Sequence, residues 1–265
     1  MCCQPPSKID DIERNWNRNI QLIDSAPLDL PSIGITGGEP TLLGDKFFDL
    51  VKYIRERLPN TEIHILSNGR AFADKYFASR LSQLDSDLIL FGIPLHSDNQ
   101  LDHDAIAGAP NAFTETLKGL YNLARYSFDI ELRIVITKMN YRRLPQMASF
   151  IFKNLPFVRY VSLMGLEYTG YSIKNADKVW IDPVDLQEQL CKAVQFLSMA
   201  ALDVSIFNYS HCVLPGVLWP FARKSISDWK VRYEPFCDDC EMKMSCCGLF
   251  ATSKKQSQNI HPIKK

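Results

Sequence analysis

The chain has 265 residues, and its 30 basic and 30 acidic side chains give a formal net charge of zero at pH 7. A chain of this length can bury a large apolar core without crosslinks, so its eight cysteines need an explanation other than stability. Zero net charge argues against a surface that holds nucleic acid by bulk electrostatics.

No apolar run reaches the roughly 18 to 20 residues of a membrane span. The N-terminus, beginning Met1-Cys2-Cys3, lacks the charged leader and apolar stretch of a secretory signal. We therefore expect a cytoplasmic protein without nucleic-acid or membrane partners, whose cysteines bind metal or take part in catalysis.

Apolar periodicity predicts helices and strands that alternate along most of the chain. Helices are expected over about 8–25, 47–58, 71–84, 111–127, 143–154 and 186–201. Strands are expected over 31–36, 62–67, 88–95, 130–137, 160–164 and 204–207. The last of these helices is preceded by Asp182 and Pro183, which suit the N-cap and first-turn positions. Such alternation indicates right-handed βα units on a parallel sheet, whose functional residues lie at the carboxyl ends of the strands.

The composition divides the chain into three parts. Residues 1–208 carry the alternating pattern and form the barrel-like α/β part. From about residue 209 the alternation stops, and the segment 209–250, rich in Cys, Trp, Pro and Phe, is typical of a small metal-stabilised extension. The segment 251–265 ends in Lys264-Lys265, and we expect it to be a flexible, solvated tail.

The most informative stretch is Gly-Ile-Thr-Gly-Gly-Glu-Pro at residues 34–40. Taken alone, it could be a strand–turn–helix connection that needs glycine. Because it follows a predicted strand, with cysteines upstream, Gly37, Gly38, Glu39 and Pro40 resemble the Gly-Gly-Glu-Pro motif of radical S-adenosylmethionine (SAM) enzymes. The resemblance implies a partial (β/α)6 TIM-like barrel, in which this motif binds the methionyl amino group of SAM at the end of the second barrel strand.

The same resemblance implies a Cys-x3-Cys-x2-Cys loop after the first barrel strand. Three thiolates there hold a 4Fe-4S cluster, and SAM chelates the fourth iron. Cys2 fits the third ligand, while the other two ligands and the first strand would precede Met1. We therefore expect the start of the barrel to be absent from this chain. Cys3 is a weaker ligand candidate, and both cysteines could instead be ordinary thiols at a frayed terminus.

A second cysteine cluster lies in the extension and consists of Cys212, Cys237, Cys240 and Cys246. A Cys-x2-Cys pair can direct both sulfurs at one metal, and four such ligands can hold zinc or an iron–sulfur cluster. The Cys-x2-Cys-x5-Cys spacing resembles the auxiliary-cluster region of SPASM/Twitch radical SAM enzymes. Phe250 stands where a SPASM region carries its next cysteine, which favours a single auxiliary cluster of the Twitch type. The adjacent Cys247 and the isolated Cys191 are expected to be incidental.

Polar residues at other strand ends are weaker candidates. Within the resemblance, Asn68, Ser97, Thr137 and Asn140 could bind the ribose or carboxylate of SAM. Arg133, within a strand, could pair with the carboxylate or could be an outward-facing surface residue. Glu167 and Tyr168 could contact adenine or substrate, or could have a capping role. The five histidines share no ligand spacing and are expected to be structural or on the surface.

Residues 2–6, 165–170 and 218–230 together resemble the His-Xaa-Ser system radical SAM maturase, C-type subunit. The resemblance implies an enzyme that reductively cleaves SAM to a 5′-deoxyadenosyl radical and modifies a peptide or protein bearing His-Xaa-Ser repeats. It further implies a sister radical SAM subunit and an electron donor such as flavodoxin or ferredoxin. The aromatic segment 218–230 could either plug the extension or line a peptide groove.

Two alternatives remain open at this stage. The chain could be a non-catalytic, truncated homologue that acts as a scaffold in a maturation complex. It could also be an unrelated α/β protein that carries one zinc ribbon.

Overall fold

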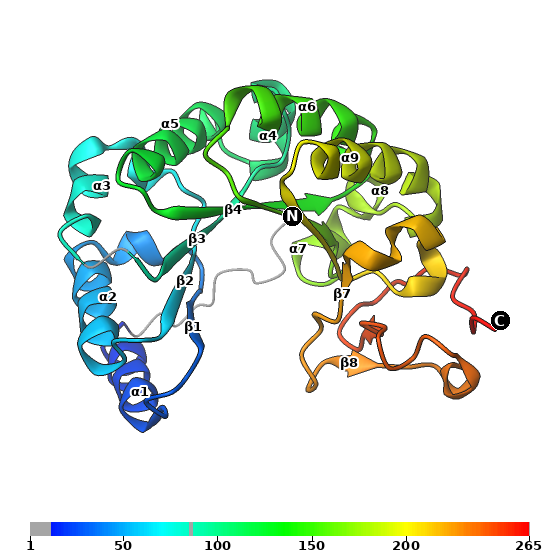
Figure 1. Cartoon of the computed structure of the whole chain (residues 1–265), viewed down its shortest axis with the longest axis horizontal. Helices are drawn as coiled ribbons and strands as arrows, with labels where there is room; N and C mark the ends of the chain where they lie inside the picture. Colours follow the sequence, from blue (N-terminus) through cyan, green and yellow to red (C-terminus); the bar gives the residue numbers. More distant parts are fainter. Residues whose placement is uncertain (1–11, 85–86, 265) are drawn as a thin grey trace. The chain divides into compact units, whose positions relative to one another are not determined.

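The computed structural model describes residues 12–84 and 87–264. The chain divides into two compact units, and we describe each by itself. Of the described residues, the N-terminal unit comprises 12–84, 87–94 and 114–131, and the C-terminal unit comprises 95–113 and 132–264. Within the described residues, strands β1 to β7 follow one another in chain order in a single sheet, and β8 and β9 form a second, two-stranded sheet (Figure 1).

The N-terminal unit consists of parallel strands with helices beside them. Its elements are α1 (Ile12–Ser25), β1 (Ser32–Ile35), α2 (Asp45–Arg57), β2 (Glu62–Leu66), α3 (Lys75–Leu81), β3 (Ile89–Pro94) and most of α5 (Ala112–Arg125). Strand β2 pairs in parallel with β1 and with β3. Figure 1 shows α2 and α3 along the same side of these three strands.

The core of the N-terminal unit is formed by alternating strand residues and by one face of α2. Ile63 and Ile65 in β2 are fully buried, while the residues between them are half-buried, as expected for a strand covered on one side. Aromatic rings extend the core, because Phe72 contacts Phe91 in β3 at a centroid distance of 5.1 Å. Phe91 in turn lies 5.2 Å from Phe128. These apolar contacts hold β2 and β3, and β2 pairs with β1, whose end carries the Gly-Gly-Glu-Pro motif.

The C-terminal unit continues the same alternation. Its elements are α4 (Gln100–Ala107), most of β4 (Asp129–Ile136), α6 (Leu144–Asn154), β5 (Tyr160–Gly165), α7 (Tyr171–Lys174), α8 (Ala176–Val179), α9 (Gln187–Met199) and β6 (Asp203–Phe207). Strands β5 and β6 are parallel, and α6 packs against α9. The Asp182 carboxylate accepts a 3.1 Å hydrogen bond from the Val184 backbone N–H, so it caps the 3-10 turn Pro183–Leu186 that leads into α9, as the sequence predicts.

The cysteine-rich extension attaches to this unit through β7 (Ala222–Arg223), which pairs in parallel with β6. Strands β8 (Val231–Arg232) and β9 (Leu249–Phe250) form an antiparallel pair over a small apolar cluster. Gly248, just before β9, has a φ of 71°, and a Cβ there would lie 2.6 Å from Val231 Cγ2. The turn therefore requires glycine.

The segment 251–264, for which a flexible tail is expected from the sequence, is held by hydrogen bonds to the rest of the C-terminal unit. Tyr168 exchanges two of them with the segment: its N–H donates to Ser253 Oγ (2.9 Å), and its carbonyl accepts from the Lys254 N–H (3.0 Å). Further along, Ser257 Oγ donates to Asp182 Oδ1 at 2.8 Å. The segment is thus a strap that crosses the ends of the strands rather than a freely solvated tail.

None of the helices in the described part of the chain combines the length and the apolar character needed to cross a membrane.

Candidate functional site

The Glu39 carboxylate lies at the carboxyl end of β1 and caps the 3-10 turn Pro40–Leu43. Its Oε1 atom accepts hydrogen bonds from Thr41 N (3.2 Å) and Thr41 Oγ1 (2.7 Å). Thr41 is buried, while Pro40 occupies the first-turn position, where its missing N–H costs nothing. Thr41, only two residues further along the chain, therefore orients one side of the Glu39 carboxylate.

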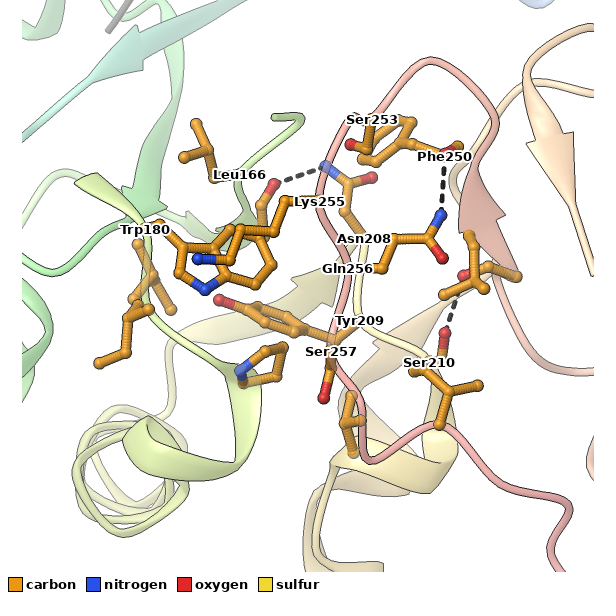
Figure 2. Close-up of a pocket in the computed structure, with 18 of the residues that line it drawn as sticks. Leu166, Trp180, Asn208, Tyr209, Ser210, Phe250, Ser253, Lys255, Gln256 and Ser257 are labelled. Carbon is orange, nitrogen blue, oxygen red and sulfur yellow. Dashed lines mark hydrogen bonds between the residues drawn. The ribbon is translucent and has the colours of Figure 1, made fainter. Parts of the chain in front are cut away.

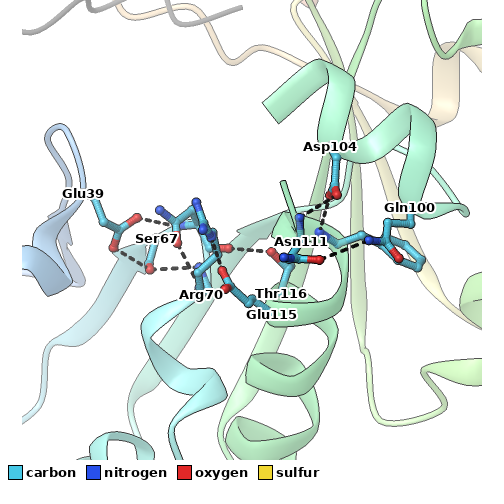
Figure 3. Close-up of polar contacts among 11 residues, drawn as sticks. Glu39, Ser67, Arg70, Gln100, Asp104, Asn111, Glu115 and Thr116 are labelled. Atoms are coloured by element: carbon cyan, nitrogen blue, oxygen red, sulfur yellow. Dashed lines mark hydrogen bonds and ion pairs between the residues drawn. The ribbon is translucent and has the colours of Figure 1, made fainter. Parts of the chain in front are cut away.

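The other side of the Glu39 carboxylate is held by the end of β2 (Figure 3). Ser67 Oγ donates to Glu39 Oε1 at 2.7 Å, and the Asn68 backbone N–H donates to Oε2 at 2.7 Å. Oε1 thus accepts three hydrogen bonds and Oε2 one. Because each carboxylate oxygen carries two lone pairs, Oε2 retains one lone pair for a further donor, such as an ammonium group.

Helix α5 supports the turn that follows β2. Thr116 Oγ1 donates to the Asn68 carbonyl at 3.1 Å, and Arg70 Nε lies 2.5 Å from Glu115 Oε2. Gly119 lets the helix approach closely, because a Cβ there would lie only 2.1 Å from the Gly69 carbonyl oxygen. The Asn68 side chain is itself engaged, since its Oδ1 accepts a 2.9 Å hydrogen bond from the Arg70 N–H.

The loop before Glu39 is open. Thr36, Gly37 and Gly38 are exposed, and a Cβ added at either glycine would meet no atom within 4 Å. A ligand can therefore approach this backbone closely beside a fixed carboxylate. The residues of the N-terminal unit thus fit the amino group of SAM, which the sequence motif leads us to expect here.

The strand-end residues of the C-terminal unit are more enclosed than the sequence suggested. Ser97 and Thr137 have no exposed surface, and Thr137 Oγ1 donates to Asn140 Oδ1 at 3.2 Å. Asn140 is equally buried, and its amide donates to the carbonyls of His96 and Val135 at 3.0 Å each. Within the C-terminal unit, Asn140 therefore joins the loop that contains His96 to the end of β4. Arg133, half-buried in β4, likewise has partners within the protein. A role for Ser97, Arg133 or Thr137 in binding SAM stays a prediction.

Two histidines that the sequence left as structural form a buried pair in the C-terminal unit. The His96 backbone N–H donates to His103 Nδ1 at 3.2 Å, and the two rings lie 5.0 Å apart. Burial lowers the pKa of His96 to about 3, helped by the neighbouring His103, and burial lowers that of His103 to about 4. Both imidazoles are therefore neutral at pH 7.

An ion pair lies beside these histidines. Arg143 donates two hydrogen bonds of 2.6 Å to the oxygens of Asp98. Burial by itself raises the pKa of Asp98. The hydrogen bonds and charge of Arg143, a backbone N–H and the Ser97 hydroxyl together more than offset it, so the pKa is lowered. The guanidinium–carboxylate geometry is bidentate, which orients the loop after β3.

Glu167, for which a ligand contact or a capping role is expected, is engaged by the extension. Its Oε2 lies 3.2 Å from Lys230 Nζ, and its Oε1 accepts a 2.6 Å hydrogen bond from Thr252 Oγ1. Lys230 also lies over the ring of Phe250, 5.3 Å from its centroid. The carboxylate thus ties the end of β5 to the extension and the strap.

The four late cysteines line one pocket in the extension. The described lining residues include Cys212, Cys237, Cys240 and Cys246, together with His211 and His261. The neighbouring Cys247 does not line the pocket and is instead buried in the apolar cluster of β8 and β9. The structure therefore brings together the cysteines that the spacing selects. Cys2 lies outside the described residues.

The thiols of this pocket differ in acidity. A hydrogen bond from Cys247 lowers the pKa of Cys246 to about 4 against the effect of burial, with help from His211 and from the Gly248 N–H. Burial raises the pKa of Cys212 and of Cys237. A stabilised thiolate suits a soft metal or an iron–sulfur cluster. As the side chains are placed, residues 12–84 and 87–264 contain no group of three His, Cys, Asp or Glu side chains that could hold a metal ion.

Two residues of these sites were missed in the sequence. Ser67 immediately precedes Asn68 at a predicted strand end, and His211 immediately precedes Cys212. In the sequence, only the position next to a candidate residue could have pointed to Ser67 or to His211. The contact of His211 with Cys246 is set by the fold, because 34 intervening positions separate them in the sequence.

Solved structures of two other proteins share this fold. SuiB from Streptococcus suis, bound to S-adenosylmethionine, has a TM-score of 0.59 and 19% sequence identity over 79% of this chain and 47% of its own. Native anSMEcpe, with bound AdoMet and Kp18Cys peptide, has a TM-score of 0.54 and 18% identity over 76% of this chain and 56% of its own. These likenesses establish the fold as the partial α/β barrel of the radical SAM type, which the sequence predicts.

Sequence comparison agrees with the fold. The Fe-coproporphyrin III synthase of Methanosarcina barkeri (strain Fusaro / DSM 804) is 29% identical over 122 residues, which cover 46% of this chain and 29% of the synthase. The chain thus spans about half the length of the solved structures and less than a third of this relative. The sequence model of the radical SAM superfamily matches residues 1–151. Because that match covers more than half of the 265 residues, the chain belongs to the radical SAM superfamily.

Proposed function

We propose that this chain is a radical SAM enzyme that cleaves SAM reductively and modifies a peptide or protein substrate. The observation that carries the proposal is the Glu39 carboxylate, which is fixed by four hydrogen bonds and lies beside an open Gly-Gly loop. In the proposal, Gly37, Gly38, Glu39 and Pro40 hold the methionyl end of SAM. Asn68, Ser97, Arg133 and Thr137 remain the proposed contacts of its ribose and carboxylate.

When bound, the 4Fe-4S cluster and SAM supply an electron and a 5′-deoxyadenosyl radical that abstracts hydrogen from an unactivated carbon. Cys2 is the proposed ligand that this chain contributes to the cluster. The task of the protein's own residues is to orient SAM and to exclude water. Glu39 would accept a hydrogen bond from the ammonium group of SAM through Oε2, while Thr41, Ser67 and Asn68 keep the carboxylate from rotating. No general acid–base pair is required for this step.

A peptide or protein substrate is proposed from two observations. One of the solved structures with this fold carries a bound peptide. The sequence of this chain resembles maturases of the His-Xaa-Ser system, so a partner with His-Xaa-Ser repeats is the specific substrate that we propose. A sister radical SAM subunit and a flavodoxin or ferredoxin electron donor belong to the same proposal.

We further propose that Cys212, Cys237, Cys240 and Cys246 bind an auxiliary iron–sulfur cluster of the Twitch type, with zinc as the alternative. The support is that all four line one pocket and that a hydrogen bond from Cys247 favours the Cys246 thiolate. Four thiolates suit either metal centre, so the choice depends on metal and sulfide analysis.

The test is incubation of full-length, anaerobically reconstituted protein with SAM, dithionite and a candidate His-Xaa-Ser peptide. We expect 5′-deoxyadenosine and methionine in equal amounts, and a mass change in the peptide. If neither product forms although the cluster is loaded, the enzyme proposal is wrong and the scaffold alternative is favoured. If both products form without a mass change, the SAM chemistry stands and the proposed substrate is wrong.

A further inference from the structure

A second pocket lies in the C-terminal unit at the ends of β5 and β6, beneath residues 253–260 of the strap (Figure 2). Its cavity volume is about 70 Å³, and it is open to solvent on one side. Its lining includes Leu166, Trp180, Tyr209, Phe250 and Lys255. It contains none of the residues proposed to bind SAM and none of the cysteines. The function proposed above therefore leaves this pocket unexplained.

Tyr209 provides a buried hydrogen-bond donor in this pocket. Only 5% of the residue is exposed, and within the described chain its hydroxyl has no hydrogen-bond partner. Burial raises the pKa of Tyr209, so the phenol remains protonated and can donate at neutral pH. Because the hydroxyl has no partner within the described chain, an acceptor on a ligand in the pocket would give it one.

Trp180 and Lys255 form the aromatic and charged part of the lining. The Lys255 ammonium lies 4.9 Å from the centroid of the Trp180 ring, and Tyr168 contacts the same ring edge-on at 5.4 Å. Lys255 is the one charged residue among those that line the pocket. In the part of the chain that the structure describes, no carboxylate pairs with it. The lining therefore offers one positive charge beside an aromatic wall.

The other polar side chains of the lining are already engaged within the protein. Ser210 Oγ donates to the Gly248 carbonyl (2.8 Å), Ser257 Oγ to Asp182 (2.8 Å), Asn208 Nδ2 to the Gly165 carbonyl (3.2 Å) and Gln256 Nε2 to the Phe250 carbonyl (3.3 Å). Ser253 Oγ accepts from the Tyr168 N–H (2.9 Å). The groups left to recognise a ligand are thus the Tyr209 hydroxyl, the Lys255 ammonium and the aromatic rings. A flat ring that carries a negatively charged acceptor complements all three.

We propose that this pocket binds an aromatic carboxylate. Its ring lies against Trp180, its carboxylate pairs with the Lys255 ammonium, and the Tyr209 hydroxyl donates to one of its oxygens. Two sources share this chemistry, namely a free aromatic acid and the aromatic C-terminal residue of a peptide. The inference does not depend on SAM cleavage, because it concerns binding at a separate pocket.

Calorimetric titration of the full chain with N-acetyl-L-tryptophan, compared with N-acetyl-L-tryptophanamide, tests the proposal. The two probes share a ring but differ in charge, so we expect the amide to bind at least about fivefold more weakly. Lys255→Gln is expected to weaken binding of the acid about fivefold, while Lys254→Gln, whose side chain does not line the pocket, leaves it unchanged. Tyr209→Phe keeps the ring, and loss of its hydroxyl is expected to weaken binding about fivefold.

Absence of binding of the acid at millimolar concentration would overturn the proposal, as would equal binding of the acid and the amide. Equal effects of Lys255→Gln and Lys254→Gln would show that the acid binds elsewhere and would overturn the assignment of the pocket. A comparison of indole-3-acetate with a pentapeptide that ends in tryptophan distinguishes the two sources. Tighter binding of the peptide assigns the pocket to a peptide end, and equal or weaker binding assigns it to a free aromatic acid.

Discussion

Ser67 Oγ donates a 2.7 Å hydrogen bond to Glu39 Oε1, which joins the carboxyl ends of β1 and β2 through two side chains. These residues are separated by 28 positions in the sequence, so the contact depends on the parallel pairing of the two strands. The consequence is that the Glu39 carboxylate is oriented before any ligand arrives. Such preorganisation reduces the entropy lost when a ligand is bound.

Gly119→Ala tests whether close approach of α5 holds the turn after β2. The added Cβ would lie 2.1 Å from the Gly69 carbonyl oxygen, so backbone must shift. We expect the free energy of unfolding to fall by about 1–3 kcal/mol, measured by urea denaturation. Gly216→Ala is the matched control, because a Cβ there meets no atom within 4 Å, and its effect should stay below about 0.5 kcal/mol. Equal stability of Gly119→Ala and the wild type would contradict the packing of this turn.

The buried histidine pair predicts loss of stability in mild acid. The folded-state pKa values of His96 and His103 are about 3 and about 4, below the value near 6.5 that histidine has when unfolded. The unfolded state therefore binds protons first, and stability is lost as pH falls from about 6.5 toward 4. Asp104, which raises the pKa of His103, opposes only part of this shift.

Between pH 7.5 and pH 5 we expect the free energy of unfolding to decrease by about 2 kcal/mol or more. His103→Asn keeps an acceptor for the His96 N–H but cannot titrate, so its stability should decrease less over the same range. Urea denaturation at the two pH values measures both proteins. A pH dependence identical in the wild type and the variant would show that His103 does not contribute.

The Glu167–Lys230 pair predicts how the extension is held. Both side chains are less than one-quarter exposed, so Lys230→Met leaves the Glu167 carboxylate with Thr252 as its remaining partner here. We expect the free energy of unfolding of Lys230→Met to fall by about 1–2 kcal/mol. We also expect faster proteolytic cleavage within residues 209–264. Lys224→Met, which replaces an exposed lysine of the same extension, should leave the cleavage rate unchanged. Equal rates for the two variants would argue against this attachment.

The pocket of the extension predicts that the four cysteines in its lining, and not the other cysteines, bind the metal of the auxiliary site. Cys237→Ala combined with Cys240→Ala should remove the iron and sulfide, or the zinc, of the auxiliary site from reconstituted protein. Cys191→Ala is the control, because this residue does not line the pocket. Quantification of iron, sulfide and zinc per chain distinguishes these outcomes. Unchanged metal content in the double variant would refute the site.

The barrel elements could be predicted from the sequence because periodicity and burial coincide in them. Each of the six predicted strands is confirmed to within one residue at each end, as in β2, where Ile63 and Ile65 alternate with half-buried residues. The short helices α4, α7 and α8 were not predicted. They span only four to eight residues, too few for a helical apolar pattern to repeat. The two-residue strands β7, β8 and β9 give no periodic signal either.

The candidate site could be predicted only in part. Gly37, Gly38 and Glu39 were identified because they form a contiguous motif, and the four cysteines because their spacing suits chelation. The partners that orient them, Ser67 for Glu39 and His211 for Cys246, lie far away in sequence and depend on tertiary structure. The packing of the strap 251–264 was also missed, because its hydrogen bonds connect residues up to 85 positions apart.

The most direct test of the account is SAM binding to cluster-loaded protein, measured by equilibrium dialysis for the wild type and for Glu39→Gln. 5′-Methylthioadenosine, which lacks the amino-acid part of SAM, serves as the matched ligand. We predict that Glu39→Gln binds SAM at least about tenfold more weakly, since a charge-assisted hydrogen bond is lost, and binds 5′-methylthioadenosine as the wild type does. Equal affinity of the two proteins for SAM would contradict the assignment of Glu39 and the function built on it.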